Sequence, residues 1–359
     1  MNRCPACGTQ YPDEARFCTK DGSKLIPLPG SRGPSASGAG NPTPARGTAA
    51  GRAEQAPPVS PTNLVDQVLD GRYKIVRKVG EGGMSFVYLA NDTATTDRYA
   101  IKVLSHALSS DQNAMQRLKR EASLGMRLAH PNVCHIIRMG ETQDGLVYVV
   151  MPFVEGEILS DRNNRKGTLP LAEATRYVVE ISAGLQVAHE LKIVHRDLKP
   201  ENIMICKSED GTERAVVMDF GLAKERRADA ELQKLTATGI ILGTPEFMSP
   251  EQLRGRPLDP RTDVYSLSLM TYEMLTAKLP FSGRTQQEMM IARLRSDPVP
   301  LRQAAPSLGL EAVERVLGKA MQRDPADRYQ TAPEFANTLA AAAKADTDES
   351  SRLGRFFGR

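Results

Sequence analysis

The sequence lacks long apolar runs, has only five cysteines and carries little net charge. No apolar stretch approaches the roughly 20 residues that a membrane-spanning helix needs, and the amino terminus has no apolar segment of the kind that directs secretion. A formal charge of +4 over 359 residues is too small to indicate a nucleic-acid-binding protein. The composition, with 25% charged and 40% hydrophobic residues, is ordinary for a globular protein. We therefore expect a cytoplasmic protein with no transmembrane segment and no nucleic-acid partner.

The few cysteines are unevenly placed, because three of the five fall within the first 18 residues. Cys4 and Cys7 form a Cys-x-x-Cys knuckle, which can direct two thiolates at one ion. Cys18 and Asp21 would complete the tetrahedron, with a carboxylate where a fourth thiolate is usual. Residues 1–26 resemble the short zinc ribbons of bacterial proteins, so we expect a zinc-ribbon-like module with a candidate structural Zn²⁺ site. A redox-active Cys-x-x-Cys and a metal-free remnant stay open as alternatives.

Residues 27–65 are rich in Pro, Gly, Ser and Ala and contain few large apolar side chains. Such a segment buries too little apolar surface to offset the entropy that ordering would cost. We therefore expect a disordered linker between the module and the rest of the chain.

The most informative stretch is residues 193–205, which read Ile-Val-His-Arg-Asp-Leu-Lys-Pro-Glu-Asn-Ile-Met-Ile. The apolar ends predict two short buried strands, which would fix the charged segment between them in a loop near the interior. Asp197, Lys199, Asn202 and the neighbouring Arg196 suit phosphate chemistry. A solvated turn would explain one or two of these residues, but not the whole set. The central octapeptide resembles the catalytic loop of the protein kinases, including the spacing from Asp to Asn.

A glycine-rich turn lies between two predicted strands near the start of the large domain. Glycines there let backbone N–H groups approach a phosphate closely, although a short glycine pattern alone would fit an ordinary hairpin. The resemblance implies that this loop covers the nucleotide, and Ser85 replaces the third glycine of the kinase pattern. The residues concerned are Val79, Gly80, Glu81, Gly82, Gly83, Met84, Ser85, Phe86 and Val87.

Lys102 is the one cation in the predicted strand at residues 99–104. A lone lysine in a strand usually marks the solvent face, but residues 115–128 after it have apolar or small side chains at helical spacing. Glu121 lies next to the inward face of that predicted helix, where an unpaired carboxylate would be costly. The separation of 19 positions matches the lysine–glutamate pair of the kinases, so we expect Lys102 and Glu121 to pair.

Residues 146–156 resemble the strand and hinge that hold adenine in the kinases. Met151 would be the gatekeeper, and Pro152 stands where an acidic residue is usual. Proline has no N–H to donate, but the resemblance assigns only a carbonyl to this position and gives the N–H donor to Val154. We expect ATP binding to be retained with a stiffer hinge.

The segment after the catalytic loop carries a second set of kinase motifs. Asp219 opens Asp-Phe-Gly after an apolar strand, 22 residues beyond the catalytic Asp, and residues 236–251 match the activation segment and its anchor. Thr236 and Thr238 are candidate phosphorylation sites. Thr244, together with Lys199, resembles the serine/threonine rather than the tyrosine branch.

Three further residues match positions that hold the kinase architecture. Glu251 ends the activation-segment anchor, and Arg328 matches the arginine that pairs with it. Asp263 fits the buried helix that braces the catalytic loop, where Tyr265 replaces the usual tryptophan in a chain without tryptophan.

Residues 71–341 are therefore identified as resembling the bacterial eukaryotic-like (Hanks-type) serine/threonine protein kinases. The implied fold is α+β and two-lobed: a small antiparallel β lobe with one helix, joined by a hinge to a larger helical lobe, with ATP in the cleft. Residues 342–359 would form a polar, basic tail. A frayed end is the simpler interpretation of that tail, and contact of its basic, aromatic tip with anionic lipid or a partner is the alternative.

The resemblance also assigns the chemistry. Asp197 would accept the proton of the substrate hydroxyl, and Lys199 would stabilise the phosphoryl group during transfer. Lys102 would hold the inner phosphates, while Asn202 and Asp219 would bind Mg²⁺ or Mn²⁺. Catalysis of this kind consists mainly of positioning and electrostatic stabilisation.

Arg196 beside the catalytic Asp suggests control by phosphorylation. A phosphate on Thr236 or Thr238 would add about −1.5 to −2 charges and could order the segment against Arg196. The expected partners are proteins with Ser or Thr, and a second copy of the chain in a transient homodimer for autophosphorylation. The alternative function is a scaffold or pseudokinase whose zinc ribbon docks partners, although the intact catalytic residues argue against it.

Overall fold

The computed structural model describes nine segments of the chain. They are residues 2–3, 9–11, 26–27, 63–82, 85–104, 112–142, 145–207, 211–220 and 245–357. The chain divides into two compact units, Met1–Ala56 and Pro57–Arg359, and each is described by itself.

The first unit contains a small antiparallel sheet in the order β2-β1-β3. Its strands are β1 (Asn2–Arg3), β2 (Gln10–Tyr11) and β3 (Ile26–Pro27). The predicted metal ligands Cys4, Cys7, Cys18 and Asp21 lie outside the described residues.

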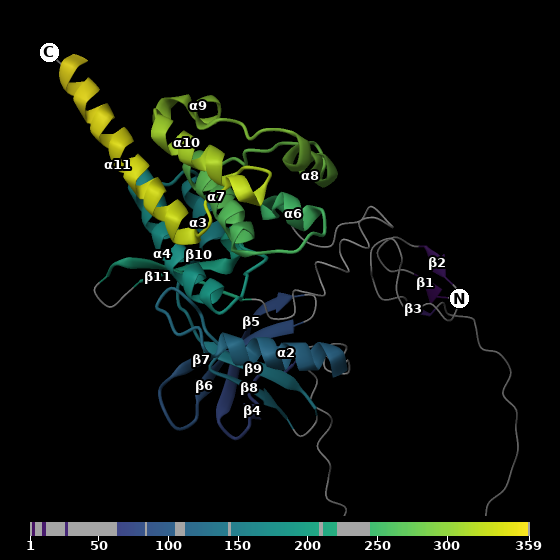
Figure 1. Cartoon of the computed structure of the whole chain (residues 1–359). Helices are drawn as coiled ribbons and strands as arrows, with labels where there is room; N and C mark the ends of the chain where they lie inside the picture. The colour runs from purple at the N-terminus through teal and green to yellow at the C-terminus, as the bar shows by residue number, and fades with distance from the viewer. Residues whose placement is uncertain are drawn as a thin grey trace, which may run out of the picture. The chain divides into compact units, whose positions relative to one another are not determined.

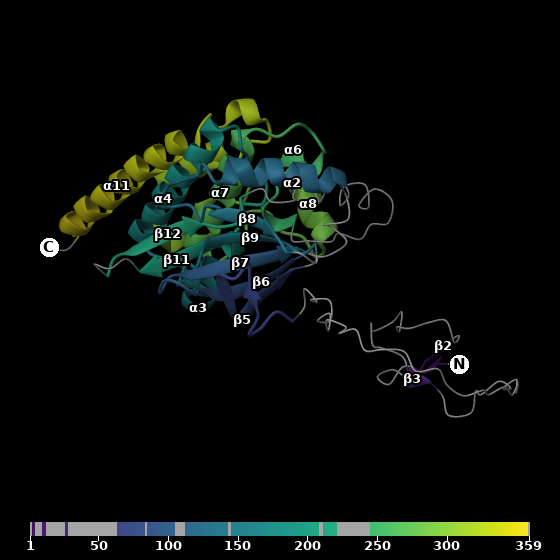
Figure 2. The ribbon, with the colours of Figure 1, turned by 90° about the horizontal axis from the view of Figure 1, so that it is seen from below.

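The second unit begins with an antiparallel six-stranded sheet in the order β4-β5-β6-β7-β9-β8. Helix α2 (Gln112–Gly125) lies across its strands in both views (Figure 1, Figure 2). The strands are β4 (Val68–Leu69), β5 (Tyr73–Gly82), β6 (Ser85–Asp92), β7 (Arg98–Leu104), β8 (Arg138–Glu141) and β9 (Val147–Pro152).

The two faces of this sheet bury separate apolar clusters. Successive side chains of a strand point to opposite faces, and β7 follows this rule: Ile101 and Val103 belong to one cluster, whereas Ala100 and Leu104 belong to the cluster that includes α2. Lys102 shares its parity with Ala100 and Leu104. The alternation therefore places this lysine on the face that α2 covers.

The larger lobe is mainly helical and is built around α7 (Pro260–Thr276). Most residues of α7 are buried, as expected for a helix with apolar side chains on every face. The other helices are α3 (Leu159–Lys166), α4 (Leu171–Glu190), α6 (Pro250–Leu253), α8 (Gln286–Arg295), α9 (Leu301–Ala304), α10 (Glu311–Ala320) and α11 (Ala332–Phe357).

Among the residues that the structure describes, this lobe also contains a small sheet and four short 3₁₀ turns. The sheet has the order β10-β11-β12. Its strands are β10 (Glu157–Ile158), β11 (Ile203–Lys207) and β12 (Glu213–Val217). The turns are η1 (Pro200–Asn202), η2 (Pro245–Phe247), η3 (Pro306–Leu308) and η4 (Pro325–Asp327). The predicted two-lobed α+β architecture is confirmed.

The second unit is longer at both ends than the predicted residues 71–341. Leu64, assigned to the linker, is fully buried in the small-lobe core. At the other end, α11 runs on to Phe357 in place of a frayed tail, with Ala343 and Asp346 buried, and its far end stands clear of the other helices (Figure 1). The physical reason is that a continuous helix can carry apolar and capping contacts beyond the last recognisable motif. Within the described segments, the structure contains no helix that is both long and apolar enough to span a membrane.

Candidate active site

The hairpin of β11 and β12 brings the catalytic loop and the Asp-Phe-Gly segment together. Ile203 at the start of β11 pairs with Val217 at the end of β12. The Met218 N–H donates to the Asn202 carbonyl oxygen at 2.8 Å. This pairing places Asp219 beside a loop that lies 17 or more positions earlier in the sequence.

Within the loop, three of the predicted residues lie in mutual contact. Lys199 Nζ is 3.3 Å from Asp197 Oδ1. Asn202 Nδ2 donates to the Asp197 backbone carbonyl at 2.6 Å and to its Oδ2 at 3.1 Å. Because Asn202 directs its amide nitrogen at Asp197, its amide oxygen is the atom left to face a metal.

Lys102 reaches across to Asp219, with Nζ 2.7 Å from Oδ1. Its side chain is 12% exposed and that of Asp219 is 36% exposed, so the pair is partly shielded from water. Asp219 has a positive φ of 56°, which is uncommon for a residue other than glycine. The expected partner Glu121 belongs to α2, but its side chain lies outside the described part of the structure.

His195 is fully buried and joins the two segments. Its Nε2 is 2.9 Å from the Met218 carbonyl oxygen, and its Nδ1 is 3.3 Å from the Asp197 backbone N–H. A carbonyl can only accept and an N–H can only donate, so these contacts require a neutral ring with its proton on Nε2. The ring also packs edge-on against Phe220, with centroids 4.9 Å apart.

Asp263 on α7 accepts hydrogen bonds from the backbone of the catalytic loop. Its carboxylate accepts the N–H groups of His195 at 2.8 Å and Arg196 at 3.1 Å, and His189 Nε2 lies 2.7 Å away. Burial alone would raise the pKa of Asp263, but the hydrogen bond and charge of His189, together with the backbone hydrogen bond from His195, outweigh burial and hold that pKa below its usual range. Arg196 has a φ of 67°, so these bonds stabilise a backbone conformation that is otherwise unfavourable.

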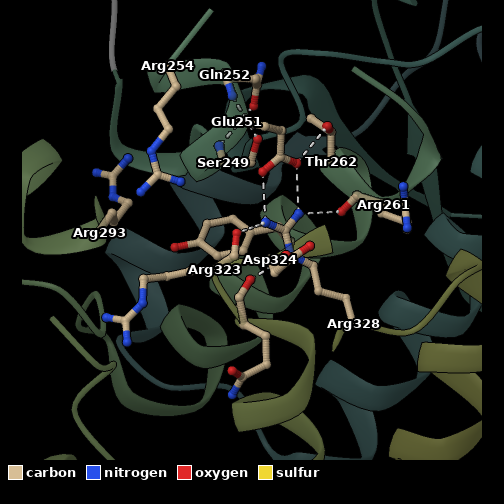
Figure 3. Close-up of polar contacts among 12 residues, drawn as sticks. Ser249, Glu251, Gln252, Arg254, Arg261, Thr262, Arg293, Arg323, Asp324 and Arg328 are labelled. Atoms are coloured by element: carbon tan, nitrogen blue, oxygen red, sulfur yellow. Dashed lines mark hydrogen bonds and ion pairs between the residues drawn. The ribbon is translucent and has the colours of Figure 1, made fainter. Parts of the chain in front are cut away.

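Glu251 and Arg328 form a buried ion pair, shown in Figure 3. Arg328 donates to both carboxylate oxygens of Glu251 at 2.7 Å. Its three remaining N–H groups donate to the carbonyl oxygens of Gln322, Arg261 and Arg323 at 2.7, 3.0 and 3.1 Å. All five guanidinium donors are therefore used, which is what a fully buried arginine requires.

The nucleotide-binding segments are only partly described. The β5–β6 hairpin pairs Gly82 with Ser85, while Gly83 and Met84 between them lie outside the described residues. Met151 at the end of β9 is buried in the cluster that includes α2.

A small pocket is lined by Met151 together with Cys134, Ile136, Asp219 and Phe220, among others. Burial raises the pKa of the Cys134 thiol to about 12, so this cysteine stays protonated at neutral pH. It is a small core side chain with a weak contact to the Pro152 carbonyl at 3.7 Å, as its apolar surroundings predict.

The activation segment falls outside the described residues, and with it Thr236, Thr238 and Thr244. Its anchor is described from Pro245 onward. Two buried residues there escaped the sequence analysis. Gln252 completes a capping box with Ser249, a pattern that the spacing Ser-x-x-Gln announces. No sequence pattern indicates the role of Arg293 on α8, because its partners are backbone carbonyl groups far away in the sequence.

The donor set fits a nucleotide with a divalent cation. A carboxylate and an amide oxygen are the hard ligands that Mg²⁺ prefers, and Asp219 and Asn202 supply them on either side of the hairpin. The cations Lys102 and Lys199 lie beside the same two segments. Each of the two segments thus has one lysine in contact with one of its carboxylates, Lys102 with Asp219 and Lys199 with Asp197.

Comparison with known proteins agrees with this geometry. Residues 73–338 match the model of the protein kinase domain, and residues 3–25 match that of a zinc-ribbon domain. The serine/threonine-protein kinase pkn2 of Myxococcus xanthus is 40% identical over 292 residues, which cover 80% of this chain and 34% of that protein. The serine/threonine-protein kinase PrkC of Bacillus subtilis is 34% identical over 290 residues, covering 81% of this chain and 43% of that protein.

The chain thus spans about a third to a half of the length of these curated relatives. Among solved structures, a variant of the PknI kinase domain of Mycobacterium tuberculosis is 26% identical with a TM-score of 0.60, and the match covers 78% of this chain and 99% of that domain. With a catalytic loop, an Asp-Phe-Gly segment and a buried anchor in these positions, the chain belongs to the protein kinase family.

Proposed function

We propose that this chain is a serine/threonine protein kinase, which transfers the γ-phosphoryl group of ATP to a protein hydroxyl. The observation that carries the proposal is that the β11–β12 hairpin joins two sets of contacts, that of Asp197 with Lys199 and Asn202 and that of Lys102 with Asp219. A scaffold would have no need of both sets.

In the proposed reaction, the substrate hydroxyl oxygen forms a bond to the γ-phosphorus while the bond between that phosphorus and the bridging oxygen of ADP breaks. Asp197 orients the hydroxyl and takes up its proton. Lys199, 3.3 Å from Asp197, neutralises charge on the transferring group, and Lys102 holds the inner phosphates. A bound Mg²⁺, held by Asn202 and Asp219, would supply charge neutralisation on the phosphate oxygens.

The test is transfer of phosphate from labelled ATP to casein, a generic acceptor protein, with Mg²⁺ present or chelated. We expect labelled phosphoserine or phosphothreonine from the wild type and at least a hundredfold less from Asp197→Asn, because the base is lost while the shape is kept. Labelling that is unaffected by Asp197→Asn would overturn the assignment. Labelled phosphotyrosine would overturn the assignment of the chain to the serine/threonine kinases.

Autophosphorylation at Thr236 or Thr238 is part of the same proposal. The support is chemical: Arg196 is a cation one position before Asp197, and a phosphate adds about −1.5 to −2 charges. The double variant Thr236→Ala with Thr238→Ala should lower activity, and unchanged activity would remove these sites from the account. A transient homodimer and a cytoplasmic location stay predictions.

For the first unit we propose a structural Zn²⁺ bound by Cys4, Cys7, Cys18 and Asp21. Three thiolates and a carboxylate are ligands that zinc accepts, and residues 3–25 match a zinc-ribbon domain. Metal analysis should find one zinc per chain, lost in Cys4→Ser. Zinc retained by Cys7→Ser and Cys4→Ser alike would contradict this ligand set. We further propose that this module docks a partner protein.

A further inference from the structure

Gln252, one residue after the anchoring Glu251, is buried and uses both ends of its side-chain amide. Its Oε1 accepts the Ser249 backbone N–H at 2.9 Å, and the Ser249 hydroxyl accepts the Gln252 N–H at 3.3 Å. These two bonds are the capping box of α6, which Figure 3 shows beside the Glu251–Arg328 pair. A capping glutamine needs only its oxygen for this purpose.

The amide nitrogen of Gln252 has a different partner. Its Nε2 donates to the Arg196 backbone carbonyl at 2.6 Å, across 56 positions of sequence. Arg196 directly precedes the catalytic Asp197. Gln252 is buried and Arg196 is half-buried, so this hydrogen bond is partly shielded from water and is stronger than it would be at the surface.

Two restraints converge on Arg196, whose φ of 67° is in the left-handed region. Its N–H is held by Asp263 at 3.1 Å, and its carbonyl oxygen is held by Gln252. A residue other than glycine persists in that region only when its surroundings enforce it. Asp263 restrains the peptide before Arg196, and Gln252 restrains the peptide that leads into Asp197. Gln252 therefore acts on the side of the catalytic carboxylate.

The other end of the anchor is equally fixed. Arg293 on α8 is buried and donates to the carbonyl oxygens of Pro245 and Met248, the latter at 3.3 Å. The Ser266 hydroxyl donates to the Phe247 carbonyl at 2.8 Å. Residues 245–249 are thus hydrogen-bonded to α7 and α8. Gln252, which caps the same segment, links it to the catalytic loop through the Arg196 carbonyl oxygen.

We propose that Gln252 is a positioning residue for Asp197, which couples the end of the activation segment to the catalytic carboxylate through the Arg196 carbonyl. This inference rests on the proposed kinase function. Capping of α6 is a separate role of the same side chain, and the two roles involve different atoms. Substitutions can therefore separate them.

The test compares Gln252→Met with Ser249→Ala. Methionine has nearly the same length and shape but neither donates to Arg196 nor accepts from Ser249, whereas Ser249→Ala removes one bond of the capping box and keeps the bridge. The quantities to be measured are kcat and KM for Mg-ATP with casein as acceptor, Tm, and the hydrogen–deuterium exchange of peptides that cover residues 194–202. Exchange reports on the loop without requiring activity.

We expect both variants to lower Tm, but only Gln252→Met to lower kcat, by about tenfold or more, because small displacements of a reacting group cost up to about a hundredfold. KM for ATP should stay within about twofold, and exchange in residues 194–202 should rise in Gln252→Met alone. Equal kcat in the two variants, or unchanged exchange in a folded Gln252→Met protein, would overturn the proposal. A wild type that transfers no phosphate would overturn the proposed function and this inference with it.

Discussion

At the scale of single residues, the site depends on backbone conformations that the surroundings impose. Arg196 and Asp219 both have positive φ, at 67° and 56°. The cost of such a conformation is of order 1–3 kcal/mol per residue. For Arg196 it is offset by the buried hydrogen bonds of Asp263, so a side chain of α7 fixes the backbone conformation of the catalytic loop.

Replacement of Asp263 tests this dependence. Asn has one acceptor oxygen in place of two, and its NH₂ group would face N–H groups of the loop. We expect Asp263→Asn to lower the free energy of unfolding by about 3 kcal/mol or more, since it breaks a buried charged network, and to lower kcat as well. Urea unfolding measures the first effect. The exposed Asp161→Asn serves as the control, with a change within about 0.5 kcal/mol, and equal effects of the two substitutions would contradict the account.

Glu273 on α7 predicts a dependence of stability on pH. Burial, with additional repulsion from Glu201 and Glu246, raises the pKa of Glu273 from 4.5 to about 7, against a hydrogen bond from Asn163. Between these values the folded state binds more protons than the unfolded state. The contribution of this group to stability is therefore complete below pH 4.5 and is lost as pH rises toward 7.

The measurement is the free energy of unfolding at pH 5 and pH 8. We expect Glu273→Gln to gain stability relative to the wild type at pH 8 compared with pH 5, by up to roughly 3 kcal/mol from the size of the shift. The exposed Glu311→Gln should show the same pH dependence as the wild type. A difference between wild type and Glu273→Gln that does not change with pH would rule out this origin.

At the scale of elements, the anchor joins α6 to the turn that precedes α11. Arg328 is fully buried in its pair with Glu251, and burial alone would raise the pKa of that carboxyl; the hydrogen bonds and charge of Arg328 outweigh burial and lower it. Such a pair stabilises little relative to an apolar pair, but the loss of one partner leaves a buried charge.

We therefore expect Arg328→Ala to cost about 3–5 kcal/mol of unfolding free energy. The matched control is Arg302→Ala, which removes an ion pair with Glu314 in which the arginine is 78% exposed, and which should cost less than about 1 kcal/mol. Chemical denaturation of the two variants measures the difference. Similar losses would show that burial does not set the strength of this pair.

The last helix supplies a cap to its neighbour. Leu310 at the N-cap of α10 offers no side-chain hydrogen bond, and Asp346 on α11 accepts the N–H groups of Ala312 and Val313 instead, each at 3.0 Å. A chain that ends at residue 341 loses this cap and the buried Ala343. We expect it to melt several degrees lower than a chain that ends at residue 348, because a lost cap costs about 1 kcal/mol. Equal Tm values would place the end of the fold at residue 341.

The elements also show which features the sequence could predict. The catalytic loop and Asp-Phe-Gly are compact motifs, whereas the pair of Glu251 with Arg328 spans 77 positions and was expected only from the resemblance to the protein kinases. The Lys102–Asp219 contact spans 117 positions, and the bridge from Gln252 to Arg196 depends on how α6 packs against the loop. Contacts of that kind arise from tertiary packing, and no periodicity or spacing encodes them.

The burial of residues on either side of residues 71–341 arises for a related reason. Leu64 precedes the recognisable strands, and Asp346 follows a run of alanines interrupted by Lys344. Composition described both segments as linker or tail. Their burial follows from contacts with other elements, the small-lobe core for Leu64 and the start of α10 for Asp346, and a single sequence does not reveal such contacts.

At the scale of the whole molecule, a small sheet in Met1–Ala56 accompanies a two-lobed unit in Pro57–Arg359. The two carry different chemistry: thiols suited to a structural metal in the first, and carboxylates, an amide and lysines suited to phosphoryl transfer in the second. Every residue that we propose to take part in transfer belongs to the second unit. The central claim is therefore that this unit moves phosphate.

The most direct test is the intact mass of phosphatase-treated full-length protein before and after incubation with Mg²⁺ and ATP, beside Asp197→Asn. The account predicts that the wild type gains one or more whole phosphate groups and that Asp197→Asn, which should still bind ATP, gains none. Binding of ATP by the wild type without any gain in mass, together with no transfer to casein, would contradict it.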